Sequence, residues 1–460
     1  MAWNKSQKAS LFIISTALFL GTFLVSSINI ALSVIGKQFE LNAVTLSWII
    51  TAYLLATALL MLPVGRWADM HDKQKVFKYG IAVFSVGTVL CALAPYGWFL
   101  IVSRFIQGMG IALPMSVGNA ILMSIFPPNQ RGRVLGISIS FIYTGLALGP
   151  FLGGILTELL GWRSIFYMGA VLGIAVTIAA FMFLGKGKHA ENLIPLKFKG
   201  TCVYGLSLLA LIYGSSTIPR VFGWLSIVLG IALMALFFRI ENKSSFPVLN
   251  VKLFTKNKLF TFSTLSALIN YSATFAIVFL LSLYLQKIKL LSPREAGFVL
   301  LVQPLVMALF SPLMGRLSDK IEPRFLATSG MTLCTLGLVS FAFLSETTPI
   351  HTILAVLVMV GLGFAMFSSP NMNTIMSSVE KNIYGLASSI TETMRVLGQM
   401  VSMTIATLLF SIFFASSQVA DIPNDVFVKT ISISFGVFAI ICSVGIAFSY
   451  FRGNVRQKNG

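Results

Sequence analysis

A few charged side chains within long apolar runs are the residues that could carry chemistry. In the run 384–415, Glu392 is followed by Arg395 three residues later and by Gln399 seven residues later, which places all three on one stripe of a helix. Desolvation favours the neutral form of a carboxyl group, and a nearby arginine favours the charged form. The pair could therefore take up and release a proton, as a proton-coupling site does, or hold a fixed ion pair, and both alternatives stay open.

A second charged position lies in the apolar run 98–125. Arg104 is placed about one turn into this run, and Gln107 follows one turn later. An arginine side chain keeps its proton, so it provides a fixed positive charge that pairs with a carbonyl or an acid. Ionisable groups in hydrocarbon are costly and are functional candidates by default. The alternative is a structural arginine whose head group reaches the membrane surface.

Polar side chains in these apolar runs are the candidates for contact with a bound small molecule. They stand among 39 phenylalanines and 19 methionines, so a cavity built from them would be mostly apolar with few polar anchors. Each one could equally form a hydrogen bond between helices. These candidate binding residues are Asn29, Gln107, Asn119, Asn270, Tyr271 and Gln303.

The stretch 145–154 indicates a close helix contact and a hinge. It contains Gly145, Gly149, Pro150, Gly153 and Gly154. Glycines at every fourth position form a stripe that another helix can approach closely. Pro150 leaves the Leu146 carbonyl without its helical donor and favours a kink, which a membrane helix tolerates where a neighbour satisfies the carbonyl. The alternative is a tightly packed helix with no role in transport.

Composition predicts the class of protein that holds these residues. The chain has 460 residues, of which 57% are hydrophobic and 10% charged. No soluble domain of this length can hide so much apolar surface, and many runs reach the roughly 20 residues that cross a bilayer. We therefore expect an all-α integral membrane protein with fourteen spans. The expected spans lie near 9–34, 45–64, 78–94, 98–125, 135–158, 164–185, 200–216, 222–239, 259–285, 296–314, 325–344, 350–370, 384–415 and 428–451.

The placement of charge predicts the orientation. Most of the 33 lysines and arginines lie in loops that share one side with both termini. Basic loops stay on the cytoplasmic side, so both termini are expected to be cytoplasmic, in the plasma membrane of a prokaryote. The net charge of +19 is then explained without nucleic acid as a partner.

An internal repeat divides the chain. Gly65, Asp69 and Lys73 follow the second span, and Gly315 and Asp319 follow the second span of the last six. Two such loops indicate two related six-helix bundles, residues 1–185 and 259–460, joined by a two-helix insert and linker at 186–258.

Asp69 is a candidate for controlling conformation, since its carboxylate could cap a helix or pair with Arg133.

These motifs resemble those of the major facilitator superfamily, in its fourteen-helix drug:proton antiporter branch. The resemblance rests on the loops 65–75 and 315–324, on the Arg104–Gly110 segment and on the stretch 145–154. It implies the major facilitator fold, a role of Arg104 in proton coupling, and gating by the glycine stretch and the Asp69 loop. The branch often has an acid in its first helix, where this chain has Leu24, so the residue that carries the proton is left open.

The resulting hypothesis is a secondary transporter, not an enzyme, that exports lipophilic drugs or related small molecules in exchange for protons. No phosphate-binding loop that would indicate ATP-driven transport occurs, and only three histidines are present, so no cofactor or metal site is expected. Its expected partners are a small lipophilic substrate, protons and membrane lipid, and the resemblance implies a monomer. The alternatives are a facilitator or uptake carrier, an exporter of an endogenous lipid or metabolite, and a membrane sensor that does not transport.

Overall fold

The structure is a computed structural model that describes residues 3–69, 71–127, 130–185, 198–244, 251–380, 384–414 and 417–454. Within these ranges every named element is a helix, and the only β-type pairing there is an isolated antiparallel bridge between Asn42 and Gln418. The predicted all-α class is confirmed. The side chain of Asp69 lies outside the described residues.

Sixteen helices are described. The first group is α1 (Lys5–Gln38), α2 (Ala43–Asp69), α3 (Lys73–Ala92), α4 (Gly97–Ile125), α5 (Arg131–Leu160) and α6 (Arg163–Phe183). A pair follows, α7 (Phe198–Thr217) and α8 (Val221–Lys243). The last group is α9 (Val251–Lys256), α10 (Lys258–Thr274), α11 (Ala276–Lys287), α12 (Pro293–Ser318), α13 (Pro323–Phe341), α14 (Ile350–Ser377), α15 (Tyr384–Phe414) and α16 (Asn424–Phe451).

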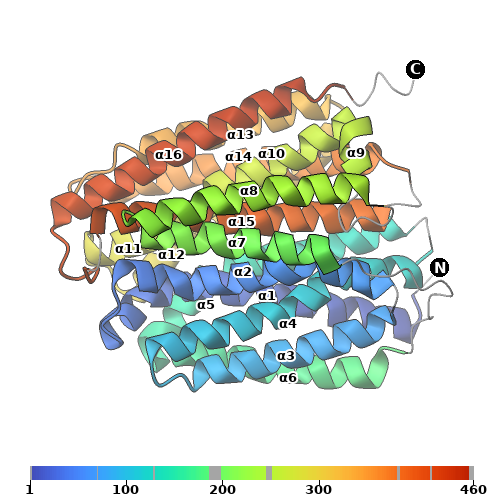
Figure 1. The fold of residues 1–460 in the computed structure, drawn as a ribbon, viewed down its shortest axis with the longest axis horizontal. Helices are drawn as coiled ribbons and strands as arrows, with labels where there is room; N and C mark the ends of the chain where they lie inside the picture. The colour runs from blue at the N-terminus through green and yellow to red at the C-terminus, as the bar shows by residue number, and fades with distance from the viewer. Residues whose placement is uncertain are drawn as a thin grey trace.

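Thirteen stretches of the described chain are long and apolar enough to cross a membrane, with α10 and α11 together forming one of them. The helix α7 has 20 residues and is not among the thirteen; it corresponds to the expected span 200–216. The helices run side by side, and α1 begins at the same end of the molecule at which α16 ends (Figure 1). We call this end the terminal face and the other end the opposite face.

Two helix bundles and a separate pair make up the body. In the first bundle α1 packs on α5, and α3 and α2 pack on α4; in the second, α13 packs on α14 and α16, and α10 packs on α15. The bundles meet where α5 packs on α12 and where α2 packs on α15. The expected boundaries at 185 and 258 stay a prediction, because residues 186–197 and 245–250 lie outside the described part.

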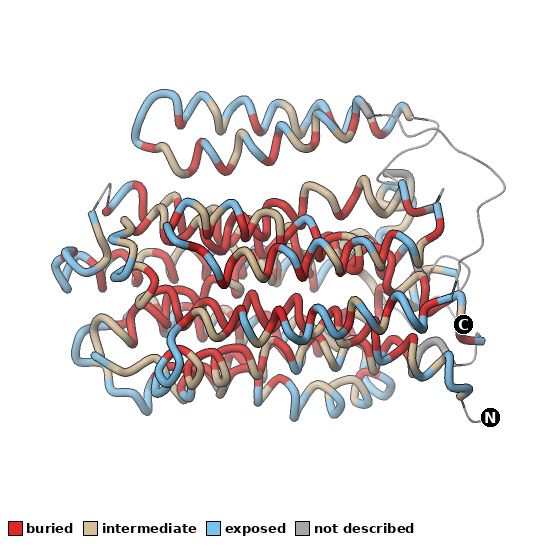
Figure 2. The backbone as a smooth tube through the Cα atoms, turned by 90° about the horizontal axis from the view of Figure 1, so that it is seen from below, coloured by how far each residue is buried: buried red, intermediate tan, exposed pale blue. Residues whose placement is uncertain are grey.

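The helices α7 and α8 form a hairpin on one flank of the body (Figure 2). The hydroxyl of Tyr204 on α7 donates to the Ala58 carbonyl of α2 at 3.0 Å. Ser411 of α15 donates to the Ile218 carbonyl at the end of the hairpin. The hairpin is therefore bonded to both bundles, over the seam between α2 and α15.

One expected span is interrupted. The sequence predicts a single helix over 259–285, but the structure ends α10 at Thr274 and begins α11 at Ala276. The Ala276 amide donates to the Ser402 hydroxyl of α15 at 3.0 Å, so a side chain from a neighbouring helix provides this amide with an acceptor. No proline or glycine marks the interruption, and the sequence pattern therefore gave no signal of it.

The glycine stretch of α5 lies against α1. A Cβ atom placed on Gly145 would lie 2.4 Å from Thr22 Oγ1, and one placed on Gly149 would lie 2.4 Å from Ser26 Cβ. Only glycine permits this approach. The helix continues through Pro150 because Ser26 donates to the Leu146 carbonyl at 2.9 Å, which replaces the donor that the proline removes.

The two bundles are closed against each other at the opposite face. A Cβ atom on Gly297 of α12 would lie 2.4 Å from the Pro150 carbonyl oxygen, and one on Gly154 would lie 2.5 Å from the Pro293 carbonyl oxygen. The carboxylate of Glu158 accepts from the Arg294 amide at 3.2 Å. On the other side of the seam, Ser47 and Thr407 hydroxyls lie 2.8 Å apart.

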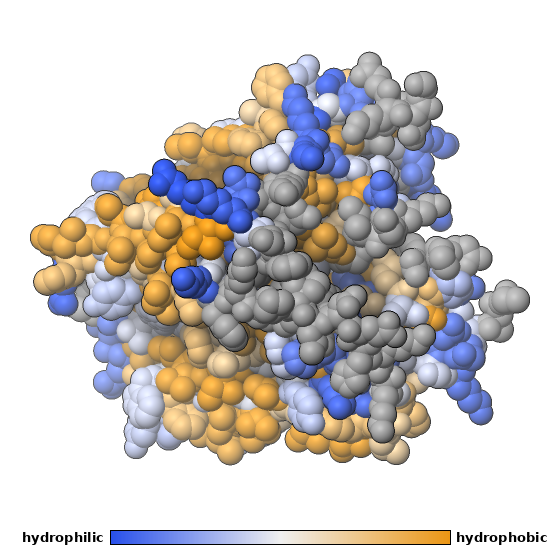
Figure 3. All heavy atoms as spheres, turned by 45° about the vertical axis from the view of Figure 1, so that its right-hand side comes forward, coloured by the Kyte–Doolittle hydropathy of each residue, from blue (hydrophilic) through white to orange (hydrophobic). Residues whose placement is uncertain are grey.

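The surface agrees with a membrane environment. Apolar side chains cover the flanks, and hydrophilic ones gather towards the terminal face (Figure 3). Large exposed apolar residues are frequent on the helix pair, for example Phe222, Trp224 and Leu225 of α8. In water such a surface would be unfavourable, whereas lipid chains accept it.

Gly297→Val should open the opposite face. The added methyl groups would overlap the Pro150 carbonyl, and overpacking of this kind costs about 1–3 kcal/mol, enough to raise the open population about tenfold. A single cysteine at Val278, which lines the smaller cavity described below, should then react faster with a membrane-impermeant maleimide added at that face. The control is Gly436→Val, because no atom lies within 4 Å of a Cβ placed there. Equal labelling of the two variants would contradict the closed contact.

Candidate functional site

A cavity of about 460 Å³ lies between the bundles towards the terminal face. Its walls come from the first half of α5, from α10, from the last halves of α12 and α14, and from the first half of α15. The bundles are thus packed together at the opposite face and enclose a hollow in the half nearer the termini. Glu392 and Arg395 are the charged residues among those lining the cavity.

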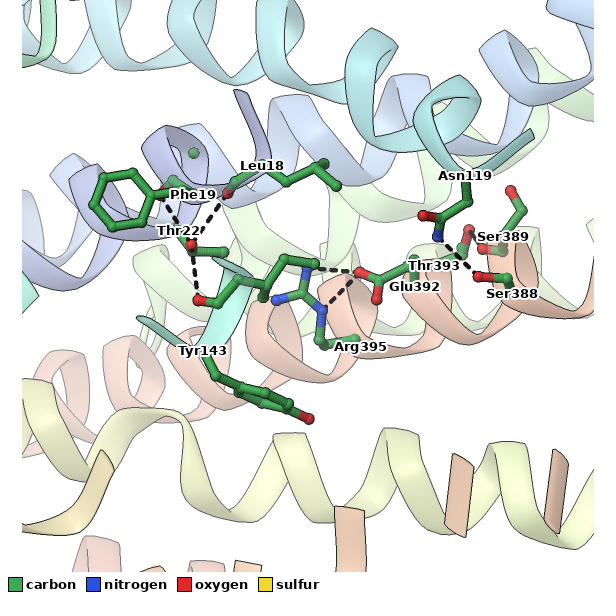
Figure 4. Close-up of polar contacts among 12 residues, drawn as sticks. Leu18, Phe19, Thr22, Asn119, Tyr143, Ser388, Ser389, Glu392, Thr393 and Arg395 are labelled. Atoms are coloured by element: carbon green, nitrogen blue, oxygen red, sulfur yellow. Dashed lines mark hydrogen bonds and ion pairs between the residues drawn. The ribbon is translucent and has the colours of Figure 1, made fainter. Parts of the chain in front are cut away.

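Glu392 and Arg395 form an ion pair across one turn of α15. The carboxylate Oε2 accepts from Nε of Arg395 at 2.8 Å and lies 2.6 Å from its second terminal nitrogen. The glutamate side chain is 13% exposed and that of the arginine 5% exposed, so the carboxylate faces the cavity and the guanidinium lies deeper. Figure 4 shows the two side chains turned toward each other, with the second carboxylate oxygen free of any drawn contact.

Arg395 also reaches the first bundle. A small cavity of about 20 Å³ lies between α1, α2, α4, α5 and α15, and Arg395 lines both this space and the larger cavity. Tyr53 of α2 borders the same small space and donates its hydroxyl to the Gly21 carbonyl at 3.1 Å. The Arg395 side chain thus lies at the contact between the bundles.

Arg104 is enclosed within the first bundle and has no exposed surface. Its Nε donates to the Ile49 carbonyl at 3.1 Å, and one terminal nitrogen donates to Gln107 Oε1. Gln107 in turn donates to Thr88 at 2.7 Å, and the guanidinium lies 4.3 Å from the centre of the Tyr53 ring. These contacts join α2, α3 and α4. The expectation that Arg104 pairs with a carbonyl agrees with the structure, and its role in proton coupling stays a prediction.

Three of the predicted binding residues come together. Asn29, Tyr271 and Gln303 line a smaller cavity of about 70 Å³ at the centre of the molecule. Tyr271 lines the larger cavity as well, so the two spaces adjoin at its side chain.

The other three predicted binding residues lie elsewhere. Gln107 belongs to the Arg104 contacts, and Asn119 of α4 donates to the Ser388 hydroxyl of α15 at 2.8 Å. Asn270 is fully buried, and it is not among the residues that line the three cavities. None of these three residues lines a cavity described above. For them the structure favours the alternative role, a packing contact or a hydrogen bond between helices.

The two repeated loops are placed at the terminal face. Gly65 lies close to α15, because a Cβ atom placed on it would lie 4.0 Å from the Ser389 hydroxyl oxygen. Gly315 packs against Ser369 of α14. The cap of α3 is Asp72, whose carboxylate accepts from the amides of Gln74 and Lys75 at 2.9 and 3.3 Å.

The remaining loop candidates are only partly informative. Arg133 lies 5.0 Å from the centre of the Trp3 ring. Lys73 begins α3, and Asp319 directly follows α12. Whether Asp69 pairs with Arg133 falls outside the described side chains, and a gating role for these residues stays a prediction.

Two groups near the cavity were not predicted. The Tyr143 hydroxyl of α5 is hydrogen-bonded to Ser368 of α14, which joins the bundles across the larger cavity. Tyr143 lies two residues before the glycine stretch, but its hydrogen-bond partner is far away in the chain, and no local pattern indicates the contact. Arg452, just past α16, donates to Asn371 of the cavity wall at 2.8 Å. Burial lowers the pKa of Arg452 to about 10, and nearby Glu322 opposes this shift, so the side chain stays charged at neutral pH.

Arg104→Met should destabilise the protein more than Arg395→Met. Loss of Arg104 leaves Gln107 Oε1 buried without a donor, which costs about 2 kcal/mol, whereas loss of Arg395 leaves a carboxylate that faces a cavity. The measurement is the apparent unfolding temperature of the detergent-solubilised protein, followed by tryptophan fluorescence. A larger drop for Arg395→Met would contradict the assignment of Arg104 to the packing of the first bundle.

A transporter and two resistance proteins are among the proteins similar in sequence to this chain. A riboflavin transporter, RibZ of Clostridioides difficile, is 31% identical over 452 residues, covering 96% of each chain. A methylenomycin A resistance protein of Bacillus subtilis is 29% identical over 87% of this chain and 86% of its own. The multidrug resistance protein Stp of Mycobacterium tuberculosis is 26% identical over 87% of this chain and 75% of its own.

Solved structures share the fold. A bacterial homologue of the human lysosomal transporter Spinster, in an inward-facing and unoccupied conformation, superposes with a TM-score of 0.71 at 16% identity, over 99% of this chain and 98% of that one. The sequence model of the Major Facilitator Superfamily matches residues 12–403. This multi-pass membrane protein therefore belongs to the Major Facilitator Superfamily of secondary transporters.

Proposed function

We propose that this chain moves small, largely apolar molecules across the membrane by alternating access, and that Glu392 couples this movement to protons. The observation that carries the proposal is the Glu392–Arg395 ion pair in the wall of the cavity between the bundles. In the proposed orientation the terminal face is cytoplasmic, because the basic loops gather there. The structure would then represent the state that loads a substrate from the cytoplasm for export.

Protonation of Glu392 provides a physical basis for coupling. The carboxylate holds the guanidinium through Oε2, while its exposed side allows proton exchange with water in the cavity. A proton on Glu392 removes the negative charge and weakens the charge-assisted bond. Arg395 can then form hydrogen bonds with acceptors in the first bundle. It already lines the same small cavity as Tyr53 of that bundle. Because this arginine lies at the contact between bundles, the proton changes the relative stability of the two access states.

A second candidate function is a carrier for riboflavin or a similar vitamin, working by uptake or without proton exchange. The similarity to the riboflavin transporter over 96% of both chains favours this substrate. The similarity to resistance proteins favours export of foreign compounds. Both candidates use the same cavities and differ in substrate, direction and the need for protons. A sensor that does not transport has no comparable support.

Glu392→Gln should uncouple proton movement from transport. In inside-out vesicles with an established pH gradient, a panel of lipophilic cations, tetracycline-like compounds, neutral drugs and riboflavin is added while the internal pH is followed. Wild-type protein should release protons when a transported compound is added. The glutamine variant cannot exchange a proton at this position, so release should be abolished while exchange of labelled compound across the membrane persists.

The matched control is Glu346→Gln, an exposed carboxyl outside the cavity, which should behave as the wild type. Proton release that survives in Glu392→Gln would place coupling on another group. Equilibration of a labelled compound by the wild type with no proton movement would establish the carrier without proton exchange.

A further inference from the structure

The smaller central cavity has an unusual lining. Both bundles contribute to it, with α1 and α5 on one side and α10, α11, α12, α14 and α15 on the other. None of the residues that line it carries a charge, and most are apolar or aromatic. It adjoins the larger cavity at Tyr271, so one part of a molecule could occupy the smaller space while the rest lies in the larger one.

Asn29, which lines this cavity, carries a buried acceptor without a donor. Its Nδ2 donates to the Val25 and Ser26 carbonyls of its own helix at 3.0 and 3.3 Å, and this fixes the orientation of the amide. Its Oδ1 points away from these carbonyls, is buried and has no hydrogen-bond partner in the described part of the chain. The side chain as a whole is nearly inaccessible, since the residue is 2% exposed.

Gln303 presents a second such acceptor from the other bundle. It lies on α12 directly before Pro304, is 7% exposed, and lines the same cavity. Its Oε1 is buried, and no described residue donates to it. A buried acceptor without a donor costs about 1–3 kcal/mol, and two of them on side chains that line one cavity point to a ligand that supplies the donors.

The remaining walls favour a flat molecule. Tyr271 and Phe364 meet edge to face with ring centres 5.4 Å apart, and Phe275 stands at the interruption between α10 and α11. All three line the cavity. Aromatic walls favour contact with the flat face of a ring, while the few polar groups fix its edge.

We propose that this cavity recognises the edge of an uncharged planar heterocycle, whose N–H or O–H donors bond to Asn29 Oδ1 and to Gln303 Oε1. The inference rests on the proposed transport function and defines its substrate class. Because one acceptor belongs to each bundle, a bound ring would bridge the bundles and stabilise them in one relative position. Compounds without such donors would leave both acceptors unpaired and bind less tightly.

The test combines two ligands with two proteins. Binding of riboflavin, which has an imide N–H, and of its derivative methylated on the imide nitrogen is measured by the quenching of flavin fluorescence with the purified full chain. The wild type should bind riboflavin about tenfold more tightly than the methylated compound, as expected for one donor to a buried acceptor. In Gln303→Met, which keeps the length of the side chain without its amide, the two compounds should bind equally. Asn29→Leu should weaken binding of riboflavin, while Thr332→Val on the exposed side of α13 should not change it.

Several outcomes would overturn the inference. If Gln303→Met weakens binding of both compounds by the same factor, Gln303 has only a structural role. If the wild type binds the two compounds equally, or binds neither of them, the cavity does not recognise the imide N–H donor. Failure here is separate from failure of the proposed function. Proton-linked transport of a compound without N–H or O–H groups would support the proposed function and contradict the proposed substrate class. Selective binding of riboflavin without proton movement would support the substrate class and contradict proton coupling.

Discussion

A backbone carbonyl or amide in apolar surroundings must find its hydrogen-bond partner within the protein, and this constraint determines how the centre of the molecule is built. At Leu146 the donor lost to Pro150 is replaced by Ser26, and at the α10–α11 interruption Ser402 accepts the Ala276 amide. Both replacements come from neighbouring helices. The irregular backbone is therefore stable only while those helices stay close, and the glycines of α5 allow α1 to approach to the required distance.

The two intramembrane arginines differ in the partners that satisfy their charged groups. Arg104 has partners on α2 and α4 that belong to its own bundle, so it reinforces packing. Arg395 has one acidic partner, lines two cavities and lies at the contact between the two bundles. A charge whose partner can be neutralised by a proton, at a contact that must change, is suited to coupling in a way that an enclosed charge is not.

Much of the architecture could be predicted from the sequence, because apolar length, basic loops and repeated glycines are local signals. The close approach at Gly145 and Gly149 follows from spacing alone. The pairing of Glu392 with Arg395 follows from helical periodicity. Depth in a helix does not tell which way a side chain points, so Asn270 and Asn29 look alike in sequence although only Asn29 lines the central cavity. The break at Phe275 and the contact of Tyr143 with Ser368 depend on partners far away in the chain, and no local pattern encodes them.

The helix hairpin α7–α8 is bonded to α2 through Tyr204 and to α15 through Ser411. Rocking of one bundle against the other changes the distance between these two anchor points. In the proposed alternating-access cycle, the hairpin either releases one anchor and forms it again, or moves with one bundle and slides along the other. The two hydrogen bonds would then add to the barrier between the proposed access states, and weakening either one would change the turnover rate.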